Sequence, residues 1–197
     1  MKIDRQRIVD TALDLLNEAG LDALTTRRLA ERLGVQQPSL YWHFKTRGAL
    51  LAALDGEILQ RGHRYTLPQP GDDWQSFLAR NAQSFRKALL AYRDGGRIHA
   101  AASAGPADLP QVETQLRFLT AQGLSLEIAV HLCAAIAHYT LGSVLAEQAG
   151  AEEPAEPGED FPMAAAARAV TRRDAGEVAF RQGLRLLIDG ADLSIDG

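Results

Sequence analysis

Cysteine is almost absent from this chain, since Cys133 is the only one in 197 residues. A single thiol cannot form an intrachain disulfide, which excludes a disulfide-stapled secreted fold and favours a reducing compartment. The first ten residues, MKIDRQRIVD, carry charge but are not followed by the apolar stretch of a secretory signal. We therefore expect a cytoplasmic protein.

A long uninterrupted hydrophobic run is also missing. The most apolar stretch, residues 129–146, is broken by His131, His138, Thr140 and Ser143. These polar side chains would be costly in lipid but cost little in a helix bundle. The sequence therefore predicts no membrane span and no membrane partner.

Alternation of apolar and polar residues, the mark of a half-buried strand, is absent, and helical spacing takes its place. We predict an all-α protein with three short helices in residues 1–46. A longer connecting helix is expected in 47–66, and a larger helical part in 67–197. The acidic, proline-containing segment 149–160 (AGAEEPAEPGED) cannot form a core-facing pattern and is expected to be a solvated, mobile loop.

A general excess of positive charge is lacking, because the formal net charge is −4. Nucleic-acid binding rests largely on neutralising phosphates, so the overall value argues against it. The distribution changes this interpretation. Residues 1–47 contain eight Lys and Arg against six acids, a local charge of +2, which leaves −6 for the rest of the chain.

What is present is a helix-turn-helix pattern in the segment LTTRRLAERLGVQQPSLYWHF. Thr25 or Thr26 can cap a short helix that Gly34 ends in the left-handed conformation. Pro38 suits the first turn of the next helix, where a missing N–H costs nothing. The exposed side of that helix would present Gln37, Ser39, Tyr41 and His43 to a major groove.

The side-chain types in this segment suit DNA. Arg27 can donate two hydrogen bonds to guanine and Gln37 can pair with adenine, while Pro38 and Tyr41 can contact a thymine methyl. Phosphate contacts are expected from these residues: Thr25, Thr26, Ser39, Lys45 and Arg47. Two large aromatics, Trp42 and Phe44, are expected to pack against neighbouring helices. The plain alternative is an ordinary helical hairpin with a polar surface.

The segment LTTRRLAERLGVQQPSLYWHFKTRGALLAAL resembles the DNA-binding part of the tetracycline-repressor family, including its Tyr-Trp-His tripeptide. The similarity continues through WQSFLARNAQSFRKALLAYRDGGRIH to FRQGLRLLIDG and is greatest to the tetracycline-responsive branch. It implies base contacts for Arg27, Gln37, Pro38 and Tyr41, and supporting contacts for Thr25, Thr26, Ser39 and Arg47. It also implies a homodimer whose four-helix interface uses the last long helices of each chain, in a C-terminal part that binds ligand and dimerises.

Six polar or aromatic residues lie beside apolar positions in the predicted larger part: His63, Asn81, Phe85, His99, Gln115 and His138. Singly, each reads most simply as a hydrogen-bonded structural residue. Together they match the family's inducer pocket, where the counterpart of His99 binds a Mg²⁺ ion chelated by the drug. No obligatory cofactor is implied. The chain departs from the family at Ala102-Ser103-Ala104 and at Ala146, which leaves the metal clamp and the drug's identity open.

An enzymatic function has little support. Asp94, His99, His131 and His138 match no zinc-ligand spacing, and neither a phosphate-binding loop nor a nucleophile elbow is present. The expected function is a homodimeric repressor that binds a palindromic double-stranded operator and is released by a polycyclic inducer. The alternatives are the same architecture sensing an unrelated aromatic or polyketide-like compound, and a regulator with no tetracycline response.

Overall fold

The computed structural model describes residues 3–102, 109–150 and 160–192, and all regular structure in these ranges is helical, which confirms the all-α prediction. The helices are α1 (Arg5–Ala19), α2 (Thr26–Leu33), α3 (Gln37–Tyr41), α4 (Arg47–Gly62), α5 (Trp74–Leu90), α6 (Gly95–Ala101), α7 (Leu109–Ala121), α8 (Leu126–Ala149), α9 (Pro162–Arg173) and α10 (Glu177–Asp192), with a 3₁₀ turn at Leu21–Ala23. Ser103, Ala104 and most of the acidic segment, residues 151–159, lie outside the described part.

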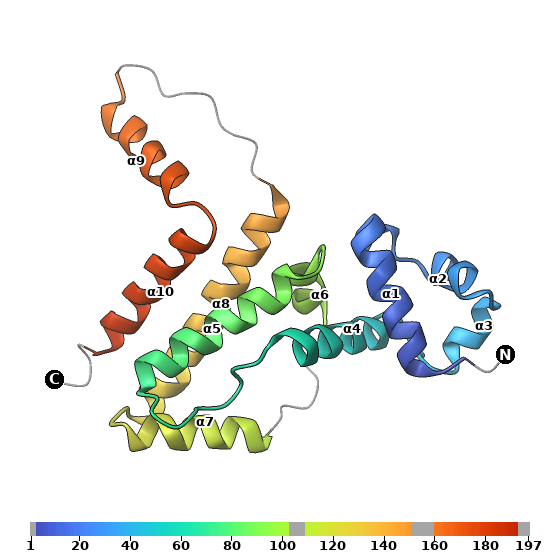
Figure 1. Ribbon diagram of the computed structural model, residues 1–197, viewed down its shortest axis with the longest axis horizontal. Helices are drawn as coiled ribbons and strands as arrows, with labels where there is room; N and C mark the ends of the chain where they lie inside the picture. Colours follow the sequence, from blue (N-terminus) through green and yellow to red (C-terminus); the bar gives the residue numbers. More distant parts are fainter. Residues whose placement is uncertain (1–2, 103–108, 151–159, 193–197) are drawn as a thin grey trace.

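Helices α1, α2 and α3 form a small unit at one end of the molecule (Figure 1). Their limits follow from capping. The Thr25 side chain accepts a hydrogen bond from the backbone of Arg28, so Thr25 is the N-cap of α2. Gly34 ends that helix with φ 66° and ψ 33°, a left-handed conformation that glycine adopts without steric cost.

The third helix is shorter than its sequence pattern suggested, and this corrects the expectation for Trp42. Helix α3 ends at Tyr41, and the chain then turns, so that Trp42 is 81% exposed. Its ring contacts the Lys45 ammonium, 5.2 Å from the ring centroid. Phe44 is buried as predicted. The turn after Tyr41 therefore sends these two aromatic side chains to different environments.

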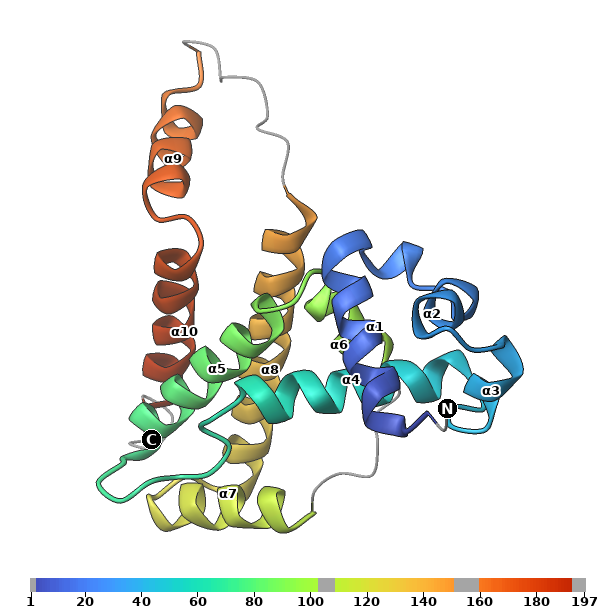
Figure 2. The same cartoon turned by 45° about the vertical axis from the view of Figure 1, so that its right-hand side comes forward.

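Helix α4 joins the small unit to the rest of the protein. It packs against α1 at one end and against α5 and α6 at the other (Figures 1 and 2). Leu54 and Ile58 are completely buried, in the same apolar cluster as Leu16 of α1 and Ile98 of α6. Full burial of such a side chain contributes about 1.5–3 kcal/mol. One continuous core thus runs through both parts of the chain.

A second core lies between α5, α7, α8 and α10, where Phe77 and Phe180 are among the most buried side chains. Helix α8 is by length and composition long and apolar enough to span a membrane, although the sequence predicted no span. Only 28% of its most apolar window is buried within this single chain. Apolar side chains remain exposed on α8, as at Leu126, and on α10, where Leu186 is 74% exposed.

The contact between α8 and α10 yields a test of packing. A Cβ atom at Gly183 of α10 would lie 2.1 Å from the hydroxyl oxygen of Tyr139 on α8. That tyrosine stacks on Phe180 and donates a hydrogen bond to its carbonyl oxygen, so it cannot simply move aside. We expect Gly183→Ala to lower the free energy of unfolding by about 1–3 kcal/mol, measured by urea denaturation.

Gly56→Ala is the matched control, because no atom lies within 4 Å of the added methyl group on α4. It should raise stability by about 0.5–1 kcal/mol through the helix preference of alanine. Equal effects of the two substitutions would contradict the close approach at Gly183.

Candidate functional site

The predicted DNA-contacting residues come from three segments that meet around one hollow, and we call the exposed surface of these segments the reading surface. It is formed by the start of α2, by α3 and by the start of α4. Arg27, Gln37 and Pro38 are exposed there, and Tyr41 is half-exposed. The Nε atom of Arg27 donates to Glu31 one turn further along α2 at 2.9 Å, a surface ion pair weak enough to exchange for another acceptor.

Behind this surface lies a hollow of about 280 Å³ between α1, α2, α3 and α4. Thr25, Thr26, Tyr41 and Arg47 line its polar rim, while buried leucines and Phe44 line its floor. Residues more than twenty positions apart in sequence therefore meet at one place. Their assembly depends on the apolar packing beneath them.

Arg47 has a structural task that the sequence did not reveal. Its guanidinium donates hydrogen bonds to the carbonyl oxygens of Leu24, at 2.8 Å, and Leu21, at 3.3 Å. These bonds fix the start of α4 to the turn before α2. A phosphate contact by Arg47 stays a prediction, and any such contact would share the guanidinium with these carbonyls.

The second candidate site, the ligand cavity, is a space of about 330 Å³ between α4, α5, α7 and α8. Four of the predicted anchors line it together: His63, Asn81, Phe85 and Gln115. The remaining wall is largely apolar, with Phe77, Leu78 and Ile136, and it includes Cys133. Burial raises the pKa of the Cys133 thiol, which keeps it a neutral, weakly polar wall group.

Two of the three amide side chains that line the cavity hold the chain that follows α4. Asn81 donates to the carbonyl oxygen of Tyr65 at 2.7 Å, and Gln115 donates to that of Thr66 at 2.6 Å. His63, the C-cap of α4, has its Nδ1 3.1 Å from the hydroxyl of Ser84. A ligand that used these polar groups would act directly on the end of α4.

His99 stands beside the cavity rather than among its lining residues. Its ring meets that of Phe85 edge-on, with centroids 5.0 Å apart, and Phe85 in turn lies 5.7 Å from the His63 ring. The Nδ1 atom of His99 pairs with Asp55 at 2.8 Å. A carboxylate on one ring nitrogen fixes the ring's orientation and leaves the other nitrogen for a ligand, as in many metal sites.

No group of three or more His, Cys, Asp or Glu side chains in the described ranges could hold a metal ion on its own. His99 can therefore supply one ligand, and a Mg²⁺ ion would need oxygens from a bound molecule and water for the rest. Ala102 and Ala146 offer no side-chain oxygen. Glu147, the neighbouring acid, pairs with Arg86 within the same chain.

His138 lies apart from the four predicted anchors that line the cavity, and a ligand contact by it stays a prediction. The structure places it on an exposed side of α8, and it does not line the ligand cavity, although its neighbour Ala137 does. Helix α8 turns about 100° per residue, so the two side chains diverge. Thr140, which the sequence argument passed over, lines the cavity instead.

The small unit of α1, α2 and α3, which we call the reading unit, also contacts the larger part of the chain at a place away from α4. Asp94, just before α6, accepts a hydrogen bond from the backbone N–H of Leu21 at 2.8 Å. Arg97 of α6 pairs with Asp22 at 2.8 Å, and the backbone of Arg93 donates to Asn17 of α1. Helix α6, which carries His99, and the residues just before it are therefore bonded to the end of α1 and to the turn that follows it.

Two family models match the chain. Residues 8–54 match the model described as bacterial regulatory proteins, tetR family, and residues 67–194 match the tetracyclin repressor-like, C-terminal domain. The chain belongs to the TetR family. The class D tetracycline repressor protein of Escherichia coli is 47% identical to this TetR-family chain over 199 residues, covering 98% of the chain and 91% of that protein.

Solved structures show the same fold. A TetR variant from Acinetobacter baumannii AYE in complex with minocycline has a TM-score of 0.88 at 44% identity, covering 100% of this chain and 96% of that one. The class A TetR in complex with 5a,6-anhydrotetracycline and magnesium has a TM-score of 0.75 at 42% identity, covering 98% of both chains. The helical fold and the family that the sequence suggested are thus confirmed.

Sequence reasoning missed several residues that shape these sites: Asp55, Tyr65, Ser84 and Asp94. Asp55 had a detectable signal, because it is a polar residue among the apolar helix positions Leu51, Leu54 and Ile58, whereas Ser84 follows Gln83 and lies one turn from Asn81 and Lys87. The pairing of Asp55 with His99 and of Ser84 with His63, 44 and 21 residues away in the chain, had no signal in the sequence. Helix pattern identifies an unusual polar residue, but only the fold identifies what it bonds.

Burial gives His63 a testable pH dependence, because it lowers the pKa of this histidine below its usual 6.5. Below about pH 6.5 the unfolded chain binds a proton that the folded chain resists, so stability falls as pH falls. We expect His63→Gln to make the loss of unfolding free energy between pH 7.5 and 5 less steep, measured by urea denaturation across that range. His131→Gln, which removes an exposed histidine, is the control, and identical slopes for wild type and His63→Gln would contradict the prediction.

Proposed function

We propose that this protein is a ligand-responsive transcriptional repressor that binds a palindromic operator as a homodimer and leaves it when a polycyclic inducer enters the ligand cavity. The observation that carries the proposal is the position of α4. Its first turn belongs to the reading surface, and its last residue is capped by His63 in the cavity wall. One helix thus connects the two sites.

The proposed homodimer is supported by α8 and α10, whose exposed apolar side chains need cover. A helix this apolar, with few of its residues buried by its own chain, is explained by a second copy packed against it. The dimer also supplies the two-fold symmetry that a palindrome requires. In this proposal the protein works in the cytoplasm, where its DNA is, and no membrane takes part.

For the release step we propose that the inducer shifts α4. Residues 1–46 would form the DNA-binding part, 47–66 the connection, and 67–197 the ligand-binding and dimerising part. An inducer that engages Asn81 and Gln115 competes with the bonds that hold residues 65 and 66. It changes operator affinity only by its difference in affinity for the two arrangements of the dimer.

Arg27 and Gln37 supply a test of DNA reading. Selection from randomised DNA should yield a two-fold symmetric site, and Arg27→Ala should relax discrimination at one base pair of each half-site by about 1–3 kcal/mol, measured by gel shift. Arg117→Ala, on an exposed side of α7, is the control. Selection of asymmetric sites, or an equal effect of the control, would contradict the proposed reading surface.

The inducer itself is the finer part of the proposal. The retained anchors His63, Asn81, Phe85 and Gln115 suit a flat polycyclic compound with a polar edge, and tetracycline is the first candidate because similar repressors are solved with such drugs. His99 and Asp55 can hold one metal position. Ala102 and Ala146 cannot hydrogen-bond metal-bound water.

Calorimetric titration of tetracycline, with Mg²⁺ and with a chelator, tests this interpretation. Side chains that hydrogen-bond metal-bound water typically contribute about 10–100-fold to metal affinity. Because Ala102 and Ala146 cannot make such bonds, we expect the chelator to weaken tetracycline binding by less than about tenfold. His99→Ala should weaken binding in both conditions, whereas His43→Ala, in the reading unit, should not. Binding abolished by chelator would show that the metal clamp is intact, and failure to bind any polycyclic aromatic would overturn the inducer proposal.

A further inference from the structure

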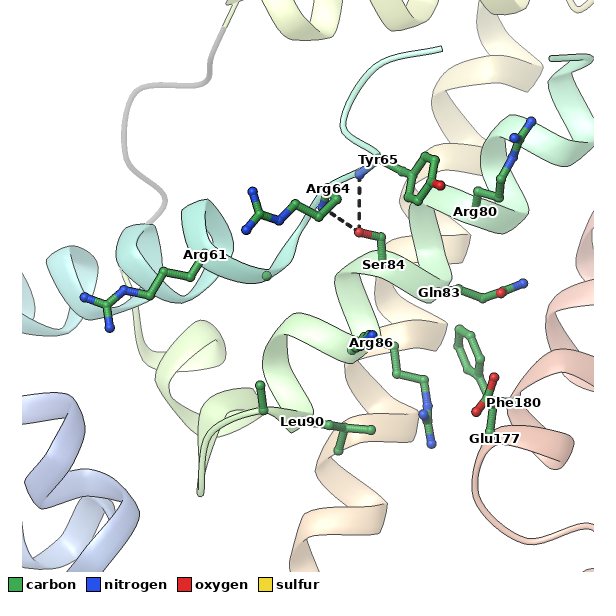
Figure 3. A pocket seen from close by; sticks show the side chains of 13 residues that line it. Arg61, Arg64, Tyr65, Arg80, Gln83, Ser84, Arg86, Leu90, Glu177 and Phe180 are labelled. Atoms are coloured by element: carbon green, nitrogen blue, oxygen red, sulfur yellow. Dashed lines mark hydrogen bonds between the residues drawn. The ribbon is translucent and has the colours of Figure 1, made fainter. Parts of the chain in front are cut away.

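A larger opening lies on the other side of α5 from the ligand cavity. This basic cleft has a volume of about 870 Å³ and is enclosed by the end of α4, by α5 and by the start of α10. Figure 3 shows the side chains that line it, which come from the end of α4 and the segment after it, from α5 and from α10. Its size falls within the range of small-molecule sites, about 300–1,000 Å³.

The cleft is lined by five cationic side chains and one acid. The cations are Arg61, Arg64, Arg80, Arg86 and Lys87. The acid, Glu177, is paired with Arg181 on its own helix, so it does not neutralise them. Arg61, Arg80 and Arg86 also have carboxylate partners outside the cleft. Arg64 and Lys87 have no side-chain partner in the part of the chain that the structure describes, and both are exposed.

Arg86 marks the floor of the cleft. Its side chain is only 9% exposed, and its guanidinium lies 5.1 Å from the centre of the Phe180 ring. One end of the guanidinium pairs with Glu147, but the buried Nε–H has no hydrogen-bond partner in the described residues. A buried N–H without an acceptor is costly and rare in native proteins. An anion in the cleft would supply the acceptor.

The wall of the cleft is held rigidly by Ser84. The backbone N–H groups of Arg64 and Tyr65 both donate to its hydroxyl oxygen, at 2.7 and 3.3 Å (Figure 3). The same oxygen lies 3.1 Å from Nδ1 of His63, which lines the ligand cavity. The cleft therefore has a fixed edge, which it shares with the inducer side of α5.

We propose that the basic cleft binds a small, multiply charged oxyanion, separately from the inducer. Guanidinium and ammonium groups hold phosphate and carboxylate oxygens through charge-assisted hydrogen bonds. Arg64 and Lys87 provide the free charges at the mouth, and Arg86 provides a buried donor at the floor. Tyr65 adds an aromatic wall for any organic part.

The test uses the full chain and two probes, inorganic pyrophosphate for phosphate chemistry and citrate for carboxylate chemistry. Each is titrated calorimetrically at constant ionic strength, so that general screening does not change. We expect saturable binding of at least one probe with one site per chain. The double variant Arg64→Gln, Lys87→Gln should bind that probe at least about tenfold more weakly, since each lost charge-assisted hydrogen bond is worth about tenfold.

The matched control is Arg117→Gln with Arg185→Gln, which removes the same charge from exposed residues paired on their own helices. It should bind the probe as wild type does. Absence of saturable binding by either probe, or an equal loss in the control, would overturn the proposal. Tetracycline titration of each variant reports on the other cavity, so a failure of the cleft is distinguishable from a failure of the proposed inducer site.

Discussion

The burial of α4 between two groups of helices is the constraint on which the rest of the structure depends. Leu54 and Ile58 have no exposed surface, and their apolar neighbours come from both the reading unit and the larger part. The two parts of the protein therefore cannot separate without exposing apolar side chains of their shared core to water. Close packing of this kind transmits displacement, because interiors are dense and resist compression.

Most of the helices could be predicted, because their positions depend on local features of the sequence. Caps at Thr25 and Gly34 and the helical spacing of apolar residues fixed the helices to within a few positions. The prediction that Trp42 is packed was wrong, because the burial of its side chain depended on where a five-residue helix ended. Helix pattern cannot settle a boundary of one or two residues, and at such a boundary a side chain changes from buried to exposed.

Some residues of the ligand cavity could likewise be predicted from the sequence, and others could not. Four anchors, three of them unusually polar for their surroundings, were identified with the help of the resemblance, and all four line the same cavity. Neither polarity nor resemblance separated His138 from these anchors, because neither shows which way a residue of a packed helix faces. Partners such as Asp55 of His99 depend on the angle between α4 and α6, a property that arises only when both helices are packed.

Asp94 lies at the polar contact between the two parts of the chain. It is the one non-glycine residue of the described chain with a positive φ, 57°, and its carboxylate holds the N–H of Leu21 across the boundary. A left-handed conformation at such a residue costs on the order of 1 kcal/mol or more and persists only while its surroundings impose it. The boundary between the two parts therefore contains a backbone conformation that is costly on its own, and the Leu21 hydrogen bond and the Arg97 ion pair both hold the Asp94 carboxylate in place.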